Sequence, residues 1–402
     1  MPASPMICMP SSIVAESLSQ SCAPAFKGSM STNTLLGGEI ARGLGGESRV
    51  KWPLRRSSDL FELRYGKALV ASSRRPGRVP VFGTNGQTGT HDTPLFAGPG
   101  VIIGRKGAGH LGVHWTDEDY WVIDTAYSLV PDADIDLKYA YYLLKYVGLN
   151  HLKHGTSNPS LTREAFGAQY FPVPPIDEQV LIAETLSAID DKIDANSRTV
   201  AQALTLARAL FESSLAQGTR TAQVGAVSEF HNRRRVPLSR REREQRPGAV
   251  PYYGATGVFG YVDEALFDEI LVLVGEDGSV VREDGGPMLQ YIWGKAWINN
   301  HAHAITGLIV STELLFLALD RADIRPIMTG AVQAKVSMGN LKSVGLRLPV
   351  GKALDVLELA LAPVFSLYRS RINESAQLRK TRDALLPELL SGRLRVSIQE
   401  SA

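Results

Sequence analysis

The sequence Arg-Pro-Gly-Arg-Val-Pro-Val-Phe-Gly-Thr-Asn-Gly-Gln-Thr-Gly at residues 75–89 returns, modified, as Arg-Pro-Gly-Ala-Val-Pro-Tyr-Tyr-Gly-Ala-Thr-Gly-Val-Phe-Gly at residues 246–260. Both copies fit the pattern R-P-G-x-V-P-x-x-G-x-x-G-x-x-G and begin 171 residues apart. Glycine is required where the backbone takes a positive φ or approaches a neighbour closely, so a glycine spacing kept twice indicates a shared fold. The chain is therefore predicted to contain one module in two copies.

The similarity continues beyond this motif. The apolar run 101–103, followed by Gly-Arg-Lys-Gly, corresponds to the run 271–274, followed by Gly-Glu-Asp-Gly. Further on, residues 155–174 correspond to residues 330–349. Each copy mixes short β-rich runs, turn signals and one or two helical stretches, which is typical of an α+β module. We therefore predict an α+β protein with two pseudo-symmetric globular domains.

A long helical pattern follows each copy. In residues 177–216, apolar side chains recur at alternating steps of four and three, as in a coiled-coil seam, with Asn196 inside the stripe. About 40 helical residues are roughly 60 Å long, so this helix is expected to bridge the two modules. The second pattern is less regular, and Pro363 is expected to break or kink its first turns. The two helices are predicted to pack as an antiparallel coiled coil; two separate amphipathic helices are the alternative.

The predicted layout alternates modules with long helices. It comprises a disordered N-terminal tail (1–51), a first recognition module (52–175), a first long helix (176–218), a second module (219–349), a second long helix (350–395) and a C-terminal tail (396–402).

Length and composition exclude several classes of protein. With 402 residues, 44% of them hydrophobic and 21% charged, the chain is expected to form two or three soluble domains. No uncharged apolar run reaches the ~18 residues that a membrane span needs. The only cysteines, Cys8 and Cys22, lie at the start of the chain and cannot staple the rest. A reducing cytoplasm is therefore the predicted location.

Motifs for catalysis and for cofactor binding are weak. Residues 107–112 fit G-x-G-x-x-G, but no helix follows to receive a pyrophosphate, which favours a tight turn. Acidic residues within 131–138 resemble part of a nuclease motif and are better explained by helix capping. Residues 158–161 lack the second proline and the aromatic residue of the adenine methyltransferase loop. His301 and His303 have no cluster that completes a metal site. We therefore expect no catalytic residue, cofactor site or metal site in this chain.

Basic and amide-bearing loops favour nucleic-acid binding. The net charge is only +2, but residues 233–246 contain seven arginines and two acids. Guanidinium groups beside amide and aromatic side chains offer phosphate donors next to groups that can read base edges. A solvated charged loop is the alternative. The candidate phosphate contacts are Arg105, Lys106, Arg233, Arg234 and Arg235; the candidate base readers are Asn85, Gln87, Asn158, Tyr253, Glu276 and Gln333, and Lys335 completes the predicted DNA-binding set.

Taken with the repeat and the helices, the sequence resembles the specificity subunits of type I restriction-modification systems over about residues 52–395. The stretches that carry the resemblance are 60–69, 98–107, 174–179 and 189–196 in the first half, and 250–257, 299–303 and 382–392 in the second. The second helix lacks the Glu178 and Gln179 pair that opens the first.

This resemblance implies a non-catalytic, cytoplasmic DNA-binding chain. Two target-recognition domains would each read one half of a split DNA sequence, with the helices fixing the distance and docking the modification (methyltransferase) subunits. S-adenosylmethionine, ATP and Mg²⁺ would belong to partner chains, which include restriction subunits in some complexes. The alternatives are the specificity chain of a related fused system, a helical scaffold that binds no DNA, and a free-standing methyltransferase or nuclease.

Overall fold

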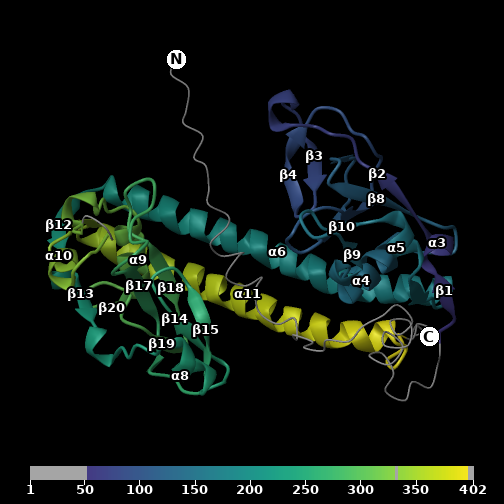
Figure 1. Ribbon diagram of the computed structural model, residues 1–402. Helices are drawn as coiled ribbons and strands as arrows, with labels where there is room; N and C mark the ends of the chain where they lie inside the picture. Colours follow the sequence, from purple (N-terminus) through teal and green to yellow (C-terminus); the bar gives the residue numbers. More distant parts are fainter. Residues whose placement is uncertain (1–51, 331–333, 397–402) are drawn as a thin grey trace, which may run out of the picture. The chain divides into compact units, whose positions relative to one another are not determined.

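The computed structural model describes residues 52–330 and 334–396, which form two compact units (Figure 1). We call residues 52–197 with 373–396 the N-terminal unit, and residues 198–330 with 334–372 the central unit. The predicted tail 1–51, both cysteines, Gln333 and the last residues of the C-terminal tail lie outside the described residues. The boundaries between the two units fall inside both long helices, so each unit contains a portion of each helix. The predicted layout instead treats each long helix as a separate segment. The predicted boundaries of the recognition domains stay a prediction.

The N-terminal unit is built on a four-stranded sheet of order β2-β8-β5-β6 and a three-stranded sheet of order β4-β3-β7. In the first sheet all neighbours are antiparallel, and its strand β5 is buried along its whole length. Its elements are β1 (Leu54–Arg56), α3 (Ser57–Leu60), β2 (Phe61–Tyr65), η1 (Ala71–Ser73), β3 (Val79–Gly83), β4 (Gly86–His91), β5 (Gly100–Gly104), β6 (Val113–Thr116), β7 (Trp121–Val122), β8 (Ala126–Pro131), α4 (Leu137–Val147), η2 (Asn150–Leu152), β9 (Lys153–His154), β10 (Ser160–Leu161), α5 (Arg163–Gly167) and β11 (Tyr170–Pro172).

The central unit repeats this plan. Its sheets have the orders β13-β20-β17-β18 and β15-β14-β19-β16. Its elements are β12 (Thr219–Gln223), α7 (Val224–Val227), β13 (Ser228–Phe230), η3 (Asn232–Arg234), α8 (Arg240–Glu244), β14 (Val250–Tyr253), β15 (Val258–Val262), β16 (Phe267–Asp268), β17 (Leu271–Gly275), β18 (Leu289–Ile292), β19 (Lys295–Ile298), β20 (Ala302–Gly307), α9 (Thr312–Asp320), η4 (Arg325–Ile327), α10 (Met338–Lys342) and β21 (Gly345–Pro349).

The repeated R-P-G motif has the same structural role in both units. Arg75 forms an ion pair with Asp92 at 2.5 Å, and Arg246 pairs with Asp263 at 2.9 Å. The third position of the motif is Gly77 in one unit and Gly248 in the other. A Cβ added to Gly77 would lie 2.2 Å from the His91 carbonyl oxygen, and a Cβ added to Gly248 would lie 2.2 Å from the Val262 carbonyl oxygen. Only glycine allows this approach. The fold therefore confirms the predicted repeat and its α+β class.

The long helices are α6 (Ile176–Leu215) and α11 (Lys352–Leu390), the two long ribbons of Figure 1. In the N-terminal unit, Glu178 near the start of α6 pairs with Arg395 beyond the end of α11, and Asp190 pairs with Arg382. In the central unit, the last turns of α6 share one apolar core with the first turns of α11. Residue numbers rise along one helix as they fall along the other, so the helices pack antiparallel, as predicted.

The helix α11 runs through Pro363 without a break, so of the predicted break or kink the break does not occur. Proline removes one helical hydrogen bond and costs about 3 kcal/mol in a helix interior. Pro363 is exposed, whereas Leu361 and Phe365 on either side are buried to 1% exposure. Burying two such side chains contributes about 3–6 kcal/mol. Tertiary packing thus offsets the local preference.

The opening of α11 also shows how the missing Glu-Gln pair is replaced. In the N-terminal unit, Gln179 Oε1 accepts a hydrogen bond of 3.0 Å from the amide of Asp136, the N-cap of α4. In the central unit, Glu358 accepts the equivalent bond of 2.8 Å from Ser311, the N-cap of α9. The Glu358 carboxylate, which lies about one helical turn further along its helix, therefore takes the place of the Gln179 side-chain amide.

Candidate DNA interface

The residues predicted for the first module lie on neighbouring loops of the N-terminal unit. Asn85 occupies the exposed turn between β3 and β4, and exposed Gln87 follows on β4. Arg105 and Lys106 directly follow β5, and exposed Asn158 lies in the loop before β10. A bridge between Lys106 and Ser160 joins the last two of these loops.

Arg105 is packed into a platform of aromatic rings. Its guanidinium lies 4.7 Å from the ring centre of Tyr65 and 5.6 Å from that of Tyr127, and it donates to the Asp124 carbonyl at 3.1 Å. The two rings are 5.1 Å apart. Burial raises the pKa of Tyr127 to about 12, and its hydroxyl donates to the Leu161 carbonyl at 3.0 Å. We call Tyr65, Tyr127 and Arg105 the Tyr65 platform. Lys106 approaches the Asp124 carboxylate at 3.4 Å.

Arg163 was missed by the sequence-based selection. It is the first residue of α5, directly after the N-cap Thr162, and its guanidinium stacks on Tyr65 at 4.1 Å. Its side chain is exposed and donates no hydrogen bond to any residue within 52–330 or 334–396. Arg163 lies within the repeated stretch 155–174, and this position could have marked it as a candidate. A single arginine nevertheless attracts less attention than the seven arginines at 233–246.

The three arginines predicted to contact phosphates from the central unit have different environments. Arg234 donates to Glu269 at 2.6 Å and to the Leu266 carbonyl at 2.8 Å, and stacks on Phe267 at 4.1 Å. Arg235 is buried to 11% side-chain exposure. Arg233 is exposed and has no partner among the residues that the structure describes. Arg233 is therefore the member of the trio whose charge is available to a ligand.

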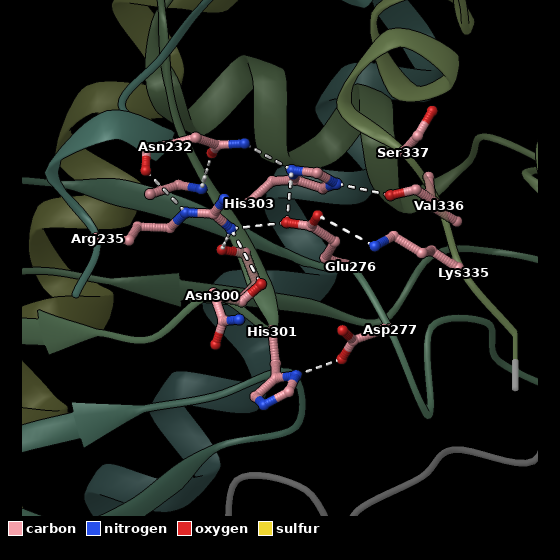
Figure 2. Close-up of polar contacts among 12 residues, drawn as sticks. Asn232, Arg235, Glu276, Asp277, Asn300, His301, His303, Lys335, Val336 and Ser337 are labelled. Atoms are coloured by element: carbon pink, nitrogen blue, oxygen red, sulfur yellow. Dashed lines mark hydrogen bonds and ion pairs between the residues drawn. The ribbon is translucent and has the colours of Figure 1, made fainter. Parts of the chain in front are cut away.

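Arg235 belongs to a polar network that Figure 2 shows around Glu276. Glu276 accepts a bond of 2.8 Å from Arg235 and lies 3.9 Å from Lys335 Nζ and 3.5 Å from His303 Nδ1. Arg235 also donates to the carbonyls of Ala302 at 2.6 Å and Asn232 at 3.1 Å. The Glu276 carboxylate is thus surrounded by cationic and polar groups and mostly shielded from solvent.

The buried imidazole of His303 fits the neutral form. Its Nε2 faces the Val336 carbonyl at 2.8 Å, so Nε2 carries the proton and donates. Its Nδ1 then accepts from the Asn232 amide at 2.8 Å. Burial is the main cause that lowers the pKa of His303. His301 points elsewhere and bonds Asp277, so the two rings of the predicted histidine pair hold different partners (Figure 2).

The two modules have one backbone arrangement here and opposite side-chain chemistry. The Leu161 amide donates to the Arg105 carbonyl at 2.8 Å, and the Val336 amide donates to the Glu276 carbonyl at 2.8 Å. These bonds make Glu276 the counterpart of Arg105. By the same registers, Ile103 pairs with Tyr127 as Val274 pairs with His303, which makes His303 the counterpart of that tyrosine.

The remaining predicted residues are dispersed. Tyr253 ends β14, half-buried, and burial raises its pKa to about 12. Lys335 is exposed beside Glu276. Nothing in the structure tests whether any of these residues contacts DNA, so their roles stay predictions.

The basic run was misleading because most of its arginines have partners within their own module. Arg240 pairs with Glu244, Arg246 with Asp263, and Arg243 donates to the Leu238 carbonyl while stacking on Tyr252. In the described part of the chain, only Arg233 and Arg241 of the seven arginines have side chains without a hydrogen-bond, ion-pair or ring partner. Most of the run therefore stabilises its own module.

Comparison with known proteins identifies the class of domain. Residues 49–205 match the family model of the type I restriction modification DNA specificity domain. A putative type I restriction enzyme specificity subunit of Haemophilus influenzae is 30% identical over 139 residues, which are 33% of this chain and 35% of that relative. The chain thus spans about a third of the length of the curated relative it matches.

A solved structure extends the likeness in fold to most of the chain. The type I restriction-modification S subunit from M. genitalium superposes with a TM-score of 0.63 at 17% identity, covering 86% of this chain and 98% of that one. The predicted resemblance is thereby confirmed: residues 49–205 are similar to the type I restriction modification DNA specificity domain, and the chain shares the fold of this S subunit. Among the described helices, none combines the length and apolar character needed to cross a bilayer.

Proposed function

We propose that this chain is the DNA-sequence specificity subunit of a type I restriction-modification complex and that its two modules read the two halves of a split target. The observation that supports this proposal is that the two modules share one backbone arrangement but carry different side chains at equivalent positions. Arg105 and Tyr127 in one module stand where Glu276 and His303 stand in the other. Base edges are distinguished by their donors and acceptors, so modules that differ in this way suit two unlike half-sites.

The DNA is proposed to meet the exposed loops that carry Asn85, Gln87 and Asn158 in one module and Arg233 in the other. Exposed amides can read base edges, and an unpaired guanidinium attracts phosphate. The environments of Arg234 and Arg235 favour structural roles instead, because their donors are occupied within the module.

The long helices are proposed to set the spacing between half-sites and to dock the modification subunits. Their antiparallel packing suits a rigid spacer. Part of α11 is available to a partner, since Leu359 is 77% exposed and Val356 is 56% exposed. Methyl transfer from S-adenosylmethionine and ATP- and Mg²⁺-dependent cleavage would belong to partner modification and restriction subunits. This chain would contribute no catalytic residue and would act in the cytoplasm, where the DNA lies.

The test is co-expression with the methyltransferase encoded beside this chain, followed by single-base mapping of methylated positions in host DNA. A split, asymmetric motif with a fixed spacer, present only when this chain is present, is the expected result. Methylation that does not change when the chain is omitted would instead support a scaffold without DNA-binding function. Methylation or cleavage by the purified chain alone would support a free-standing enzyme. A fused methyltransferase-nuclease partner in the complex would identify the related fused system.

A further inference from the structure

We propose that Arg163 is a specificity-determining residue that reads a guanine in the half-site bound by the N-terminal module. This inference rests on the proposed function. Three features of the site carry it: the free guanidinium, the platform that holds it, and its replacement in the other module.

The guanidinium of Arg163 is available to a ligand. It makes no hydrogen bond or ion pair within the described ranges, and Glu62, one of the two acids whose pKa it lowers, is engaged by Arg64 at 2.9 Å. Arginine recognises the O6 and N7 acceptors of guanine through two parallel donors, which is the commonest specific contact in the major groove. A guanidinium with all its donors free can make that contact.

The Tyr65 platform fixes this guanidinium in place. Arg163 stacks on Tyr65 at 4.1 Å, and Tyr65 packs against Tyr127. Tyr127 in turn bonds the Leu161 carbonyl, two residues before Arg163, so the platform and the loop that carries the arginine hold each other. Because the side chain is already ordered, less conformational entropy is lost on binding. An arginine that only contacts solvent would not require a supporting aromatic platform of this kind.

The other module places a methionine at the same position. Thr162 caps α5 by accepting from the Ala165 amide at 3.1 Å, and Ser337 caps α10 by accepting from Asn340 at 3.1 Å. The residue after each cap is Arg163 or Met338, and Met338 is 41% exposed. Methionine cannot donate to guanine. The guanine contact is therefore assigned to one half-site only.

The test uses the full chain co-expressed with its modification subunits, with Arg163→Met to imitate the other module and Arg163→Lys to retain the charge without the paired donors. Both variants should relax one base position of one half-site, with roughly a 5- to 150-fold loss of discrimination, leaving the other half-site unchanged. Arg55→Met is the matched control: Arg55 lies on β1, pairs with Asp134 at 3.4 Å, and has no hydrogen bond or ion pair to Glu62 or to the Tyr65 platform among the described residues. This control should leave the motif intact.

A second measurement uses the wild-type complex and needs no variant. Replacing the assigned guanine with 7-deazaguanine removes the N7 acceptor and should weaken binding by a similar factor. An unchanged motif in both Arg163 variants, with methylation still dependent on this chain, would overturn the inference and leave the proposed function standing. Binding that is insensitive to 7-deazaguanine at every guanine of the target would also overturn it. Absence of chain-dependent methylation in the wild type would overturn the proposed function itself.

Discussion

Replacing Arg235 with methionine should destabilise the central unit strongly, because it leaves the Glu276 carboxylate buried without its main partner. The side chains of Arg235 and Glu276 are 11% and 17% exposed, and their ion pair measures 2.8 Å. The substitution also removes the donor to the carbonyls of Ala302 and Asn232. Breaking a buried pair by removing one partner costs about 3–5 kcal/mol, so that is the expected loss in the free energy of unfolding.

Urea unfolding followed by tryptophan fluorescence measures this loss. Trp297 is a suitable reporter, since its indole donates to the carbonyl of Val236, the residue next to Arg235. With a slope of about 1–3 kcal/mol per molar urea, the midpoint should fall by at least about 1 M. The double variant Arg235→Met with Glu276→Leu removes both charges and should recover much of the loss.

Arg240→Met is the control, because the Arg240 and Glu244 side chains are 87% and 63% exposed and their pair should contribute nothing measurable. Equal midpoints for Arg235→Met and Arg240→Met would refute the reasoning. They would also return Arg235 to the set of side chains free to bind phosphate.

Three further predictions concern single residues. Arg233→Ala should leave stability unchanged and lower the slope of log affinity for DNA against log salt by about one, measured by titration at several salt concentrations; an unchanged slope would contradict a phosphate contact. Pro363→Ala should stabilise the chain by up to about 3 kcal/mol in thermal unfolding, because it restores a hydrogen bond in α11; a lower melting temperature would mean that the proline ring itself packs usefully. Because burial lowers the pKa of His303, the unfolded chain binds more protons below about pH 6.5, so stability should fall between pH 7.5 and 5.5. His303→Gln, which keeps a donor for Val336 and an acceptor for Asn232, should flatten part of that fall; an unchanged pH dependence would exclude His303 as its source.

The sequence predicted the repeat well because glycine requirements are local. A Cβ added at Gly77 or at Gly248 would lie 2.2 Å from a carbonyl oxygen, and a need of that kind leaves the same residue at the same spacing in both copies. The pattern of the long helices was also readable, since apolar spacing reports directly on a buried face. The predicted break at Pro363 is absent because the local cost of the proline is offset by buried neighbours that only the packed core reveals.

The candidate site was harder to predict because it depends on contacts between distant residues. Arg235 and Glu276 are 41 positions apart, so the sequence presents one as part of a basic run and the other as an isolated acid. Arg163 shows the reverse error. In the sequence it is a single arginine outside any basic run. Its importance becomes apparent only in the structure, where it stacks on Tyr65, almost a hundred residues earlier in the chain.

The composition of the N-terminal unit has a consequence for biosynthesis. Its apolar core includes Leu389 and Leu390, and its Glu178 pairs with Arg395, all supplied by the last part of the described chain. Residues 52–197 leave the ribosome long before residues 373–396 exist, an interval on the order of 10–35 seconds at bacterial elongation rates. The unit that is translated first is therefore completed last, and it must wait, with part of its core uncovered, while the central unit emerges as one continuous stretch.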